Sequence, residues 1–285
     1  MPYLEVREEA KRQMATLAGP WASAYINDQL LPNLARACRA STPTLDDVRP
    51  ALSHPFRCLE AIYRHYAFSR RGKERAELSD IAVEALYRTT SEEDIPQFLA
   101  QSGGQALWAN FEAVADERSK KAGAQLNQGP VAGLAELAQE IFRLDGRGSI
   151  VDWVVDAVDR SGHLEPEFLR MVDIRGVGPK LTSVFLRDIV FLFDLEDKVD
   201  FADRLYLQAV DKWLRQVAPH IIDEPGLDEA ADWILSGKVA KWARHGGVSG
   251  VRLNMGITHF GVVRIGPTGD PRVALTGLLT AETGR

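Results

Sequence analysis

Residues 168–187 read Phe-Leu-Arg-Met-Val-Asp-Ile-Arg-Gly-Val-Gly-Pro-Lys-Leu-Thr-Ser-Val-Phe-Leu-Arg, and this stretch predicts a helix, a tight hairpin and a second helix. Gly176 and Gly178 permit positive φ and let the backbone approach another molecule closely, and Pro179 suits the first turn of the second helix. The free amides and the positive dipole end of that helix favour an anion. We therefore expect the hairpin, with Arg175 beside its glycines, to hold a phosphate.

Lys180 lies in the first turn of the second helix, directly after Pro179. Partial burial, the helix dipole and the neighbouring cation of Arg175 would all disfavour its ammonium form. A neutral lysine amine can attack carbon, whereas an arginine guanidinium stays charged. Lys180 is therefore the predicted nucleophile, and the alternative is a lysine that only binds phosphate.

Helical periodicity dominates the rest of the chain, whereas strand-like alternation is nearly absent. Apolar residues recur at three- and four-residue spacing in the segments 30–37, 56–66, 81–87, 131–142, 168–172 and 181–193. Turn signals separate the segments, among them residues 127–130, 145–149 and 246–250. We predict an all-α protein of about ten or more helices. After residue 265 we expect a loose tail with a short strand at 272–275.

The composition is that of an ordinary packed protein, with 285 residues, 45% of them hydrophobic, and a net charge of −6. No stretch approaches the roughly 18 to 20 apolar residues of a membrane span, and the charged N-terminal stretch is unlike a signal peptide. We therefore expect a soluble, cytoplasmic protein. Cys38 and Cys58 are the only cysteines, which excludes a four-cysteine zinc or iron–sulfur site. The six scattered histidines also predict no metal site.

One segment is basic although the chain as a whole is acidic. Residues 233–269 contain no Asp or Glu, but they include Lys238, Lys241 and Arg252. Affinity for phosphates grows with the number of Lys and Arg contacts, so the distribution of charge matters more than its sum. These three cations are predicted to contact phosphates; the alternative is a solvated helix surface.

The hairpin sequence 174–187 resembles that of the endonuclease III and 8-oxoguanine DNA glycosylase superfamily, the helix-hairpin-helix DNA glycosylases. Lys180 matches the lysine that is the catalytic nucleophile of the bifunctional members. The Ser-x-Phe-Leu-Arg continuation at 183–187 is especially similar to archaeal 8-oxoguanine glycosylases that lack a metal cluster. Weaker similarity, in the same order as in the family, extends over residues 55–264. The resemblance implies a two-lobed helical fold with a central cleft.

The family also has an invariant aspartate in a Val-Asp pair that caps the helix after the hairpin. Residues 208–218, Gln-Ala-Val-Asp-Lys-Trp-Leu-Arg-Gln-Val-Ala, resemble that segment best. This implies that Asp211 caps a helix and stabilises positive charge on the sugar as the base leaves. Lys180 and Asp211 are 31 positions apart, which is longer than the usual family spacing. Asp200 and Asp203 lie nearer in sequence and remain alternatives, and any of the three aspartates could be only a helix cap.

The resemblance also implies a division of the chain. We expect an N-terminal helical extension at 1–50, a two-lobed core at 51–264 that contains the hairpin at 168–190, and a C-terminal tail at 265–285.

The resemblance implies a bifunctional DNA glycosylase and AP lyase whose substrate is double-stranded DNA with a modified base. Such a base must be flipped out of the duplex before its sugar bond can be attacked. Asn127 and Gln128 lie in a segment similar to the one that skirts the family's base pocket, so contact with a base edge is implied for them. No iron–sulfur cluster or other cofactor is expected, apart from a monovalent cation at the hairpin, and we expect a monomer. Two alternatives stay open: a monofunctional glycosylase that uses Asp-activated water, and an inactive DNA-binding module.

Overall fold

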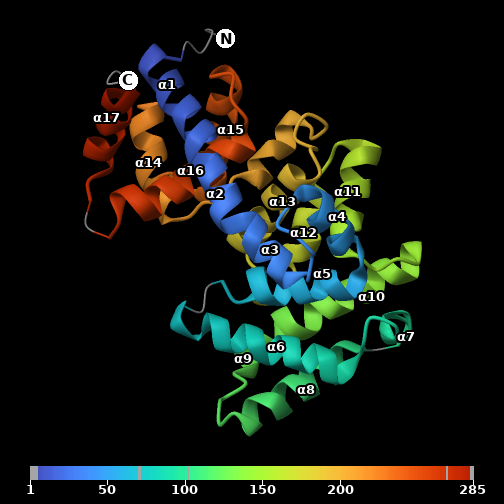
Figure 1. Cartoon of the computed structure of the whole chain (residues 1–285). Coiled ribbons are helices and arrows are strands. Elements are labelled where there is room, and N and C mark those ends of the chain that lie inside the picture. Colours follow the sequence, from blue (N-terminus) through green and yellow to red (C-terminus); the bar gives the residue numbers. More distant parts are fainter. Residues whose placement is uncertain (1–5, 70–71, 102, 268, 283–285) are drawn as a thin grey trace. The chain divides into compact units, whose positions relative to one another are not determined.

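The computed structural model describes residues 6–282, with the exception of 70, 71, 102 and 268. Every regular element in these residues is a helix (Figure 1), which confirms the predicted all-α class for the described chain. The chain divides into two compact units. Residues 31–185 form the central unit, and residues 1–30 together with 186–285 form the two-segment unit.

The central unit contains most of the helices in direct succession. Its elements are α3 (Leu31–Ala37), α4 (Leu45–Ser53), α5 (Pro55–Ala61), η3 (Ile62–Ala67), η4 (Gly72–Glu74), α6 (Arg75–Thr89), α7 (Ile95–Ala100), α8 (Gly103–Glu117), α9 (Ala124–Gln128), η5 (Gly129–Gly133), α10 (Leu134–Asp145), α11 (Ile150–Ser161), α12 (Glu165–Val172) and the first half of α13 (Pro179–Leu192).

Amphipathic spacing explains how the central helices pack. On α10 the buried residues Leu134, Leu137, Ala138 and Ile141 recur at three- and four-residue spacing, so they form one apolar stripe. α10 packs on α7 and α8, and α6 packs on α8. The short η3 and η5 segments are π-helical turns that continue α5 and α9 without a break. The predicted turn at 127–130 is wrong, because Pro130 lies at the start of η5, where a helical turn tolerates proline.

The two-segment unit joins the first helices of the chain to the last. Its elements are α1 (Glu8–Thr16), η1 (Leu17–Trp21), α2 (Ala22–Tyr25), η2 (Ile26–Leu30), the second half of α13, η6 (Phe201–Leu207), α14 (Lys212–Ile222), α15 (Asp232–His245), α16 (Gly250–Phe260), η7 (Gly261–Ile265) and α17 (Pro271–Glu282).

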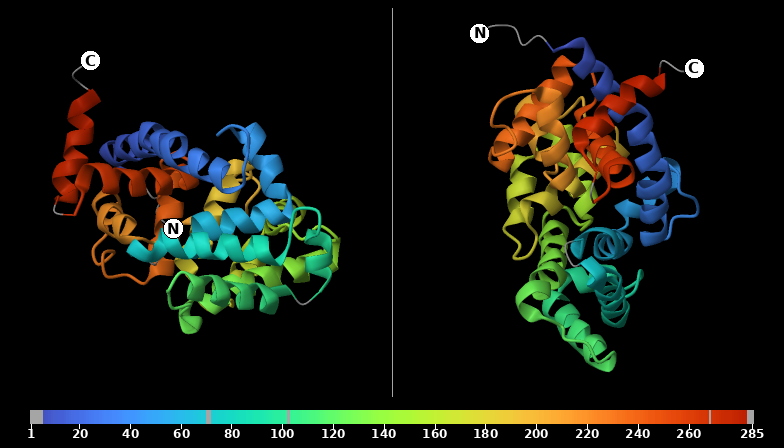
Figure 2. Two further views of the ribbon diagram at one scale, coloured as in Figure 1. Left: turned by 60° about the horizontal axis from the view of Figure 1, so that its bottom comes forward. Right: turned by 90° about the vertical axis from the view of Figure 1, so that its left-hand side faces the viewer.

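A single apolar core holds these two segments together. It includes Met14 and Leu17 from the N-terminal helices and Leu214 and Leu253 from α14 and α16. A Cβ on Gly256 of α16 would lie 1.9 Å from the Leu17 carbonyl oxygen, so glycine is required for the observed approach of these helices. The first and last helices of the unit, α1 and α17, lie side by side (Figure 2).

The C-terminal prediction is wrong. Residues 271–282 form the helix α17, and there is no strand at 272–275. Leu275 and Leu278 lie three residues apart on one side of this helix and are buried in the core, so the segment is not a loose tail. The predicted extension at 1–50 is divided after residue 30 between the two units.

Candidate functional site

The predicted helix–hairpin–helix forms. α12 ends at Val172, and the turn after it is closed by a hydrogen bond of 2.9 Å from the Val177 amide to the Ile174 carbonyl. α13 then begins at Pro179. Ile174 and Val177 are buried and anchor the turn, whereas Arg175 between them is exposed. The apolar residues of the hairpin therefore fix its shape and leave Arg175 in solvent.

The hairpin is packed tightly against the helical segment 126–133. Gly176 has φ +87°, and a Cβ there would lie 2.9 Å from Cδ of Pro130. A Cβ on Gly129 would lie 1.8 Å from the Arg175 carbonyl oxygen. The glycines thus allow two segments of this chain to touch. The close approach predicted for Gly176 is an approach to another segment of this same chain, on the side where a Cβ would lie.

Lys180 lies on the first turn of α13 with an exposed side chain. Its predicted partial burial is wrong, because α13 buries Leu181 and Phe185 and leaves the lysine in solvent. The Lys180 amine has no ion pair or hydrogen bond within the described part of the chain. Gly178, just before this helix, is half-buried. The amine is therefore free to meet a ligand, but the protein does not desolvate it.

Asp211 caps α14, as its position in the sequence predicts. Its Oδ1 accepts hydrogen bonds from the amides of Trp213 and Leu214, both at 2.8 Å. Its Oδ2 accepts one from the Thr258 hydroxyl at 3.2 Å. Trp213, Leu214 and Val217 are buried, so this side of the helix packs inward. Both oxygens of this half-buried carboxylate have donors in the protein.

The two alternative aspartates lie on the short helix η6 or just before it. Asp200 is exposed and accepts a hydrogen bond of 2.9 Å from the Ala202 amide, which caps η6. Asp203 is buried. Asp200, Asp203 and Asp211 all belong to the two-segment unit, whereas Lys180 belongs to the central unit. Which aspartate assists the lysine stays a prediction.

The fold uses the predicted phosphate-binding cations in different ways. Lys238 forms an ion pair of 2.6 Å with Glu224. Arg252 is half-buried, and its Nε donates a hydrogen bond of 2.8 Å to the Ala18 carbonyl, so it holds α16 against the N-terminal helices. Lys241 is exposed and has no ion pair among the described residues. Of the three, Lys241 is the most accessible to a phosphate.

Asn127 and Gln128, the predicted base-pocket residues, lie in the helix α9. Asn127 is 1% exposed, and its Nδ2 donates a hydrogen bond of 2.6 Å to the Ala122 carbonyl. Its Oδ1 has no hydrogen-bond partner in the described chain. Gln128 is half-buried. In this conformation Asn127 stabilises the turn before α9, and contact of either residue with a base stays a prediction.

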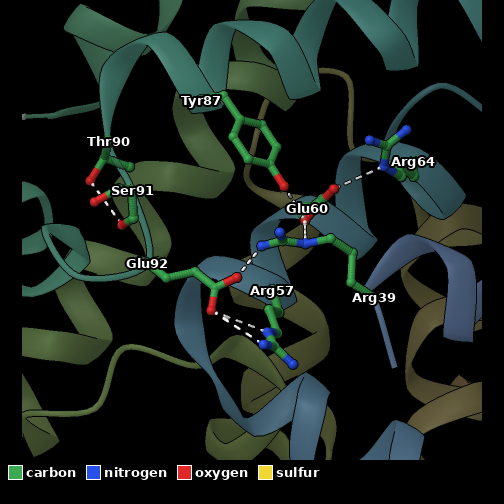
Figure 3. Close-up of polar contacts among 8 residues, drawn as sticks. All are labelled: Arg39, Arg57, Glu60, Arg64, Tyr87, Thr90, Ser91 and Glu92. Atoms are coloured by element: carbon green, nitrogen blue, oxygen red, sulfur yellow. Dashed lines mark hydrogen bonds and ion pairs between the residues drawn. The ribbon is translucent and has the colours of Figure 1, made fainter. Parts of the chain in front are cut away.

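A second polar arrangement in the central unit surrounds Glu60 on α5 (Figure 3). The Glu60 side chain is 1% exposed, yet it accepts three contacts: from Arg39 Nε at 3.2 Å, from Arg64 Nε at 3.1 Å and from the Tyr87 hydroxyl at 3.1 Å. A buried carboxylate is stable only when donors of this kind surround it. We call these four residues, with Arg57 and Glu92, the Glu60 cluster.

Glu92 extends the cluster toward the surface. Its carboxylate binds Arg39 and Arg57, the latter from Nη2 at 3.3 Å (Figure 3). Partial burial opposes the charge, but the two guanidinium groups outweigh it and hold the pKa of Glu92 below its ordinary value. Burial, assisted by the charge of Glu60, raises the pKa of Tyr87, so the phenol stays protonated and donates to Glu60.

Sequence reasoning missed the Glu60 cluster. Its members come from α5, η3, the end of α6 and the turns after α3 and before α7. Only Glu60 and Arg64 show a local signal, the four-residue spacing of a helical ion pair. That spacing is common on exposed helix surfaces, so it does not by itself indicate a buried carboxylate.

Within the described residues, no group of three or more His, Cys, Asp or Glu side chains is placed to hold a metal ion. No helix in this part of the chain has the length and apolar character needed to cross a membrane. Comparison with family models, curated proteins and solved structures found no match to the chain.

Proposed function

We propose that the chain is a DNA glycosylase that holds the DNA backbone at the hairpin 173–178 and attacks the sugar with the amine of Lys180. The observation that supports this proposal is the helix–hairpin–helix itself. It exposes Arg175 and Lys180 beside the N-terminal end of α13, where the helix dipole favours an anion. Backbone amides and cations at such a position bind phosphate without reading the base sequence.

The proposed chemistry is a displacement at C1′ of the flipped nucleoside. The Lys180 nitrogen donates its lone pair to C1′, the glycosidic bond breaks, and its electron pair leaves with the base, which takes up a proton. Opening of the C1′–O4′ bond then gives a Schiff base. Loss of a C2′ proton allows the 3′ phosphate to leave by β-elimination, which cuts the strand.

The proposed role of the aspartate is to stabilise positive charge on the sugar while the base departs. Asp211 is the first choice, with Asp200 and Asp203 as alternatives. In this role the aspartate acts without a metal or a cofactor.

The exposure of Lys180 favours a second candidate, a DNA-binding module without chemistry. An amine in solvent gains nothing from desolvation, and Asp211 already has hydrogen-bond donors on both oxygens. In this alternative Lys180 is a phosphate contact and Asp211 is a helix cap.

Borohydride trapping on a panel of duplexes, each with one oxidised, alkylated or otherwise modified base, tests the proposal. The wild-type protein is expected to form a covalent adduct with at least one duplex, and Lys180→Gln is expected to form none. Lys121→Gln is the matched control, because Lys121 is also exposed and has no ion pair with the described residues.

Three other outcomes are informative. Base release by the wild-type protein without trapping indicates a monofunctional glycosylase. DNA binding without base release from any duplex indicates the binding module. In the binding module, Lys180→Gln should reduce the slope of log K against log salt by about 0.9, the value for one lost phosphate contact. Trapping by Lys180→Gln would show that another amine reacts and would overturn the assignment of Lys180.

A further inference from the structure

A pocket of about 550 Å³ lies in the central unit, beside α3, η3 and the start of α6. Its charged and polar lining includes Arg36, Arg64, Lys73, Arg75, Ser79 and Asp80. Four of these residues are cations and one is a carboxylate, in a chain whose net charge is −6. Such a local excess of positive charge, enclosed by a concave surface, attracts anions.

Two of the cations are not engaged by the protein. The side chains of Arg36 and Lys73 are exposed and form no ion pair or hydrogen bond with the described residues. The guanidinium of Arg75 is partly engaged by the protein, because its Nη2 donates a hydrogen bond of 2.6 Å to the His65 carbonyl. The pocket therefore presents at least two free cationic groups to a ligand.

The Glu60 cluster orients a third cation of the pocket, Arg64. Glu60 accepts from Nε of Arg64, and the terminal nitrogens of this arginine point away from Glu60 (Figure 3). Nη1 of Arg64 lies 3.7 Å from Asp80, the one carboxylate in the lining. Glu60 is thus a positioning residue: it holds the guanidinium at Nε and leaves Nη1 facing Asp80 in the pocket lining.

Ser79 is an independent indication of a ligand. Ser79 lines the pocket and is 6% exposed, and its buried hydroxyl has no hydrogen-bond partner in the described chain. A buried hydroxyl without a partner is unfavourable, so a ligand oxygen that reaches it would remove that cost.

The dipole of helix α6 also favours an anion in the pocket. α6 is 15 residues long, and Arg75 and Ala76 of its first turn line the pocket. Glu77, the acidic residue of that turn, forms an ion pair of 3.1 Å with Lys120. The positive end of the dipole therefore lies at the pocket and adds to the attraction for an anion.

We propose that this pocket binds the phosphate groups of a small ligand of the diphosphate class. Several cations, a helix start and a hydroxyl donor match a group with multiple negative charges and several acceptor oxygens. The volume is that of an ordinary small-molecule site. A terminal phosphate has three free oxygens and can enter a pocket end-on, whereas a backbone phosphate of duplex DNA carries a sugar on each side. The pocket is distinct from the hairpin and does not depend on the proposed glycosylase.

Calorimetric titration of the full chain with inorganic pyrophosphate tests the proposal. Saturable binding at one site is expected. Arg36→Gln should weaken it about tenfold, the effect of losing one charge-assisted hydrogen bond. Ser79→Ala should weaken it by a smaller factor of about five. Arg143→Gln is the matched control, because Arg143 is exposed and has no partner in the described chain, and it should bind as wild type.

Two kinds of result would contradict this proposal. Absence of saturable binding, or equal affinity in all three variants, overturns the proposal. If undamaged duplex DNA displaces pyrophosphate and Arg36→Gln also weakens DNA binding, the pocket belongs to the DNA backbone and the small-ligand proposal is wrong. The two tests use different probes, pyrophosphate here and duplexes with a modified base for the proposed glycosylase, so a failure of the proposed glycosylase does not affect this test.

Discussion

The guanidinium of Arg187 binds the carboxylate of Asp188, its neighbour in the chain, with Nη2 at 2.7 Å from Oδ1. The two side chains are 2% and 0% exposed. The same guanidinium donates to Asn254 at 2.8 Å and lies over the ring of Tyr25, 5.5 Å from its centroid. This ion pair therefore ties α13 to α16 and α2 inside the two-segment unit.

Breaking the pair from one side should strongly destabilise the protein. Arg187→Met leaves the buried carboxylate of Asp188 without its guanidinium partner, and we expect a loss of about 3–5 kcal/mol in the free energy of unfolding. The double variant Arg187→Met, Asp188→Leu removes both charges and should lose less than Arg187→Met alone. Urea unfolding measures both. If the double variant lost as much unfolding free energy as Arg187→Met and Asp188→Leu together, the two side chains would not be energetically coupled.

Gly176→Ala should destabilise the hairpin through two separate effects. The residue has φ +87°, which is strained for any side chain, and the new Cβ would lie 2.9 Å from Pro130. Gly146→Ala is the control, because Gly146 has φ +75° but nothing within 4 Å of a Cβ. We expect about 1 kcal/mol for Gly146→Ala and about 1–2 kcal/mol more for Gly176→Ala. Equal losses would mean that the contact with Pro130 is easily relieved.

The features predicted well from sequence are those with a local signal. Gly176 and Pro179 mark the hairpin because only a few residue types tolerate these backbone positions. Asp211 is identified as a cap because an aspartate before an apolar helical pattern accepts the first free amides. Both features depend on residues within a few positions of one another, so no knowledge of the tertiary fold is needed.

The features that were missed depend on residues far apart in the chain. The helix α17 contributes Leu275 and Leu278 to a core that also contains Met14, and a segment rich in Gly, Thr and Pro gives little hint of it. The exposure of Lys180 follows from which side of α13 is buried. Glu60 is buried only because Arg39 and Tyr87, which are distant in sequence, supply donors. The hydrophobic pattern and the motif spacing of the sequence contain no information about these contacts between distant residues.

Glu92 should make a small contribution to stability that depends on pH. Arg57 and Arg39 outweigh partial burial and hold the pKa of Glu92 below its unfolded value. The contribution is therefore present above about pH 4.5 and is lost as pH falls through the lower, folded pKa. Because the side chain is partly exposed, we expect less than about 1 kcal/mol. The difference in unfolding free energy between wild type and Glu92→Gln should shrink between about pH 5 and pH 3.

Glu93→Gln is the control for this measurement, because Glu93 is exposed and has no ion pair with the described residues. Its difference from wild type should be close to zero at neutral pH. A Glu92→Gln variant as stable as wild type at pH 7 would contradict the assigned ion pairs.

Asp211 offers a way to separate capping from chemistry. The cap depends on Oδ1, which accepts from the amides of Trp213 and Leu214. Asparagine keeps an acceptor at this position and removes the charge, so Asp211→Asn should lose less than about 0.5 kcal/mol, whereas Asp211→Ala should lose about 1 kcal/mol. If the proposed glycosylase uses this carboxylate, Asp211→Asn should stop base release while the protein stays folded.

The same assay on Asp200→Asn and Asp203→Asn decides between the three aspartates. Asp200 is exposed and caps only the short helix η6, so its amide variant should be stable, and loss of base release there would indicate a direct role. Asp203 is buried, so its variant needs a parallel measurement of unfolding before loss of activity is interpreted. Full activity in Asp211→Asn would show that Asp211 acts only as the helix cap. The two hydrogen bonds that Oδ1 accepts from backbone amides do not require a charge.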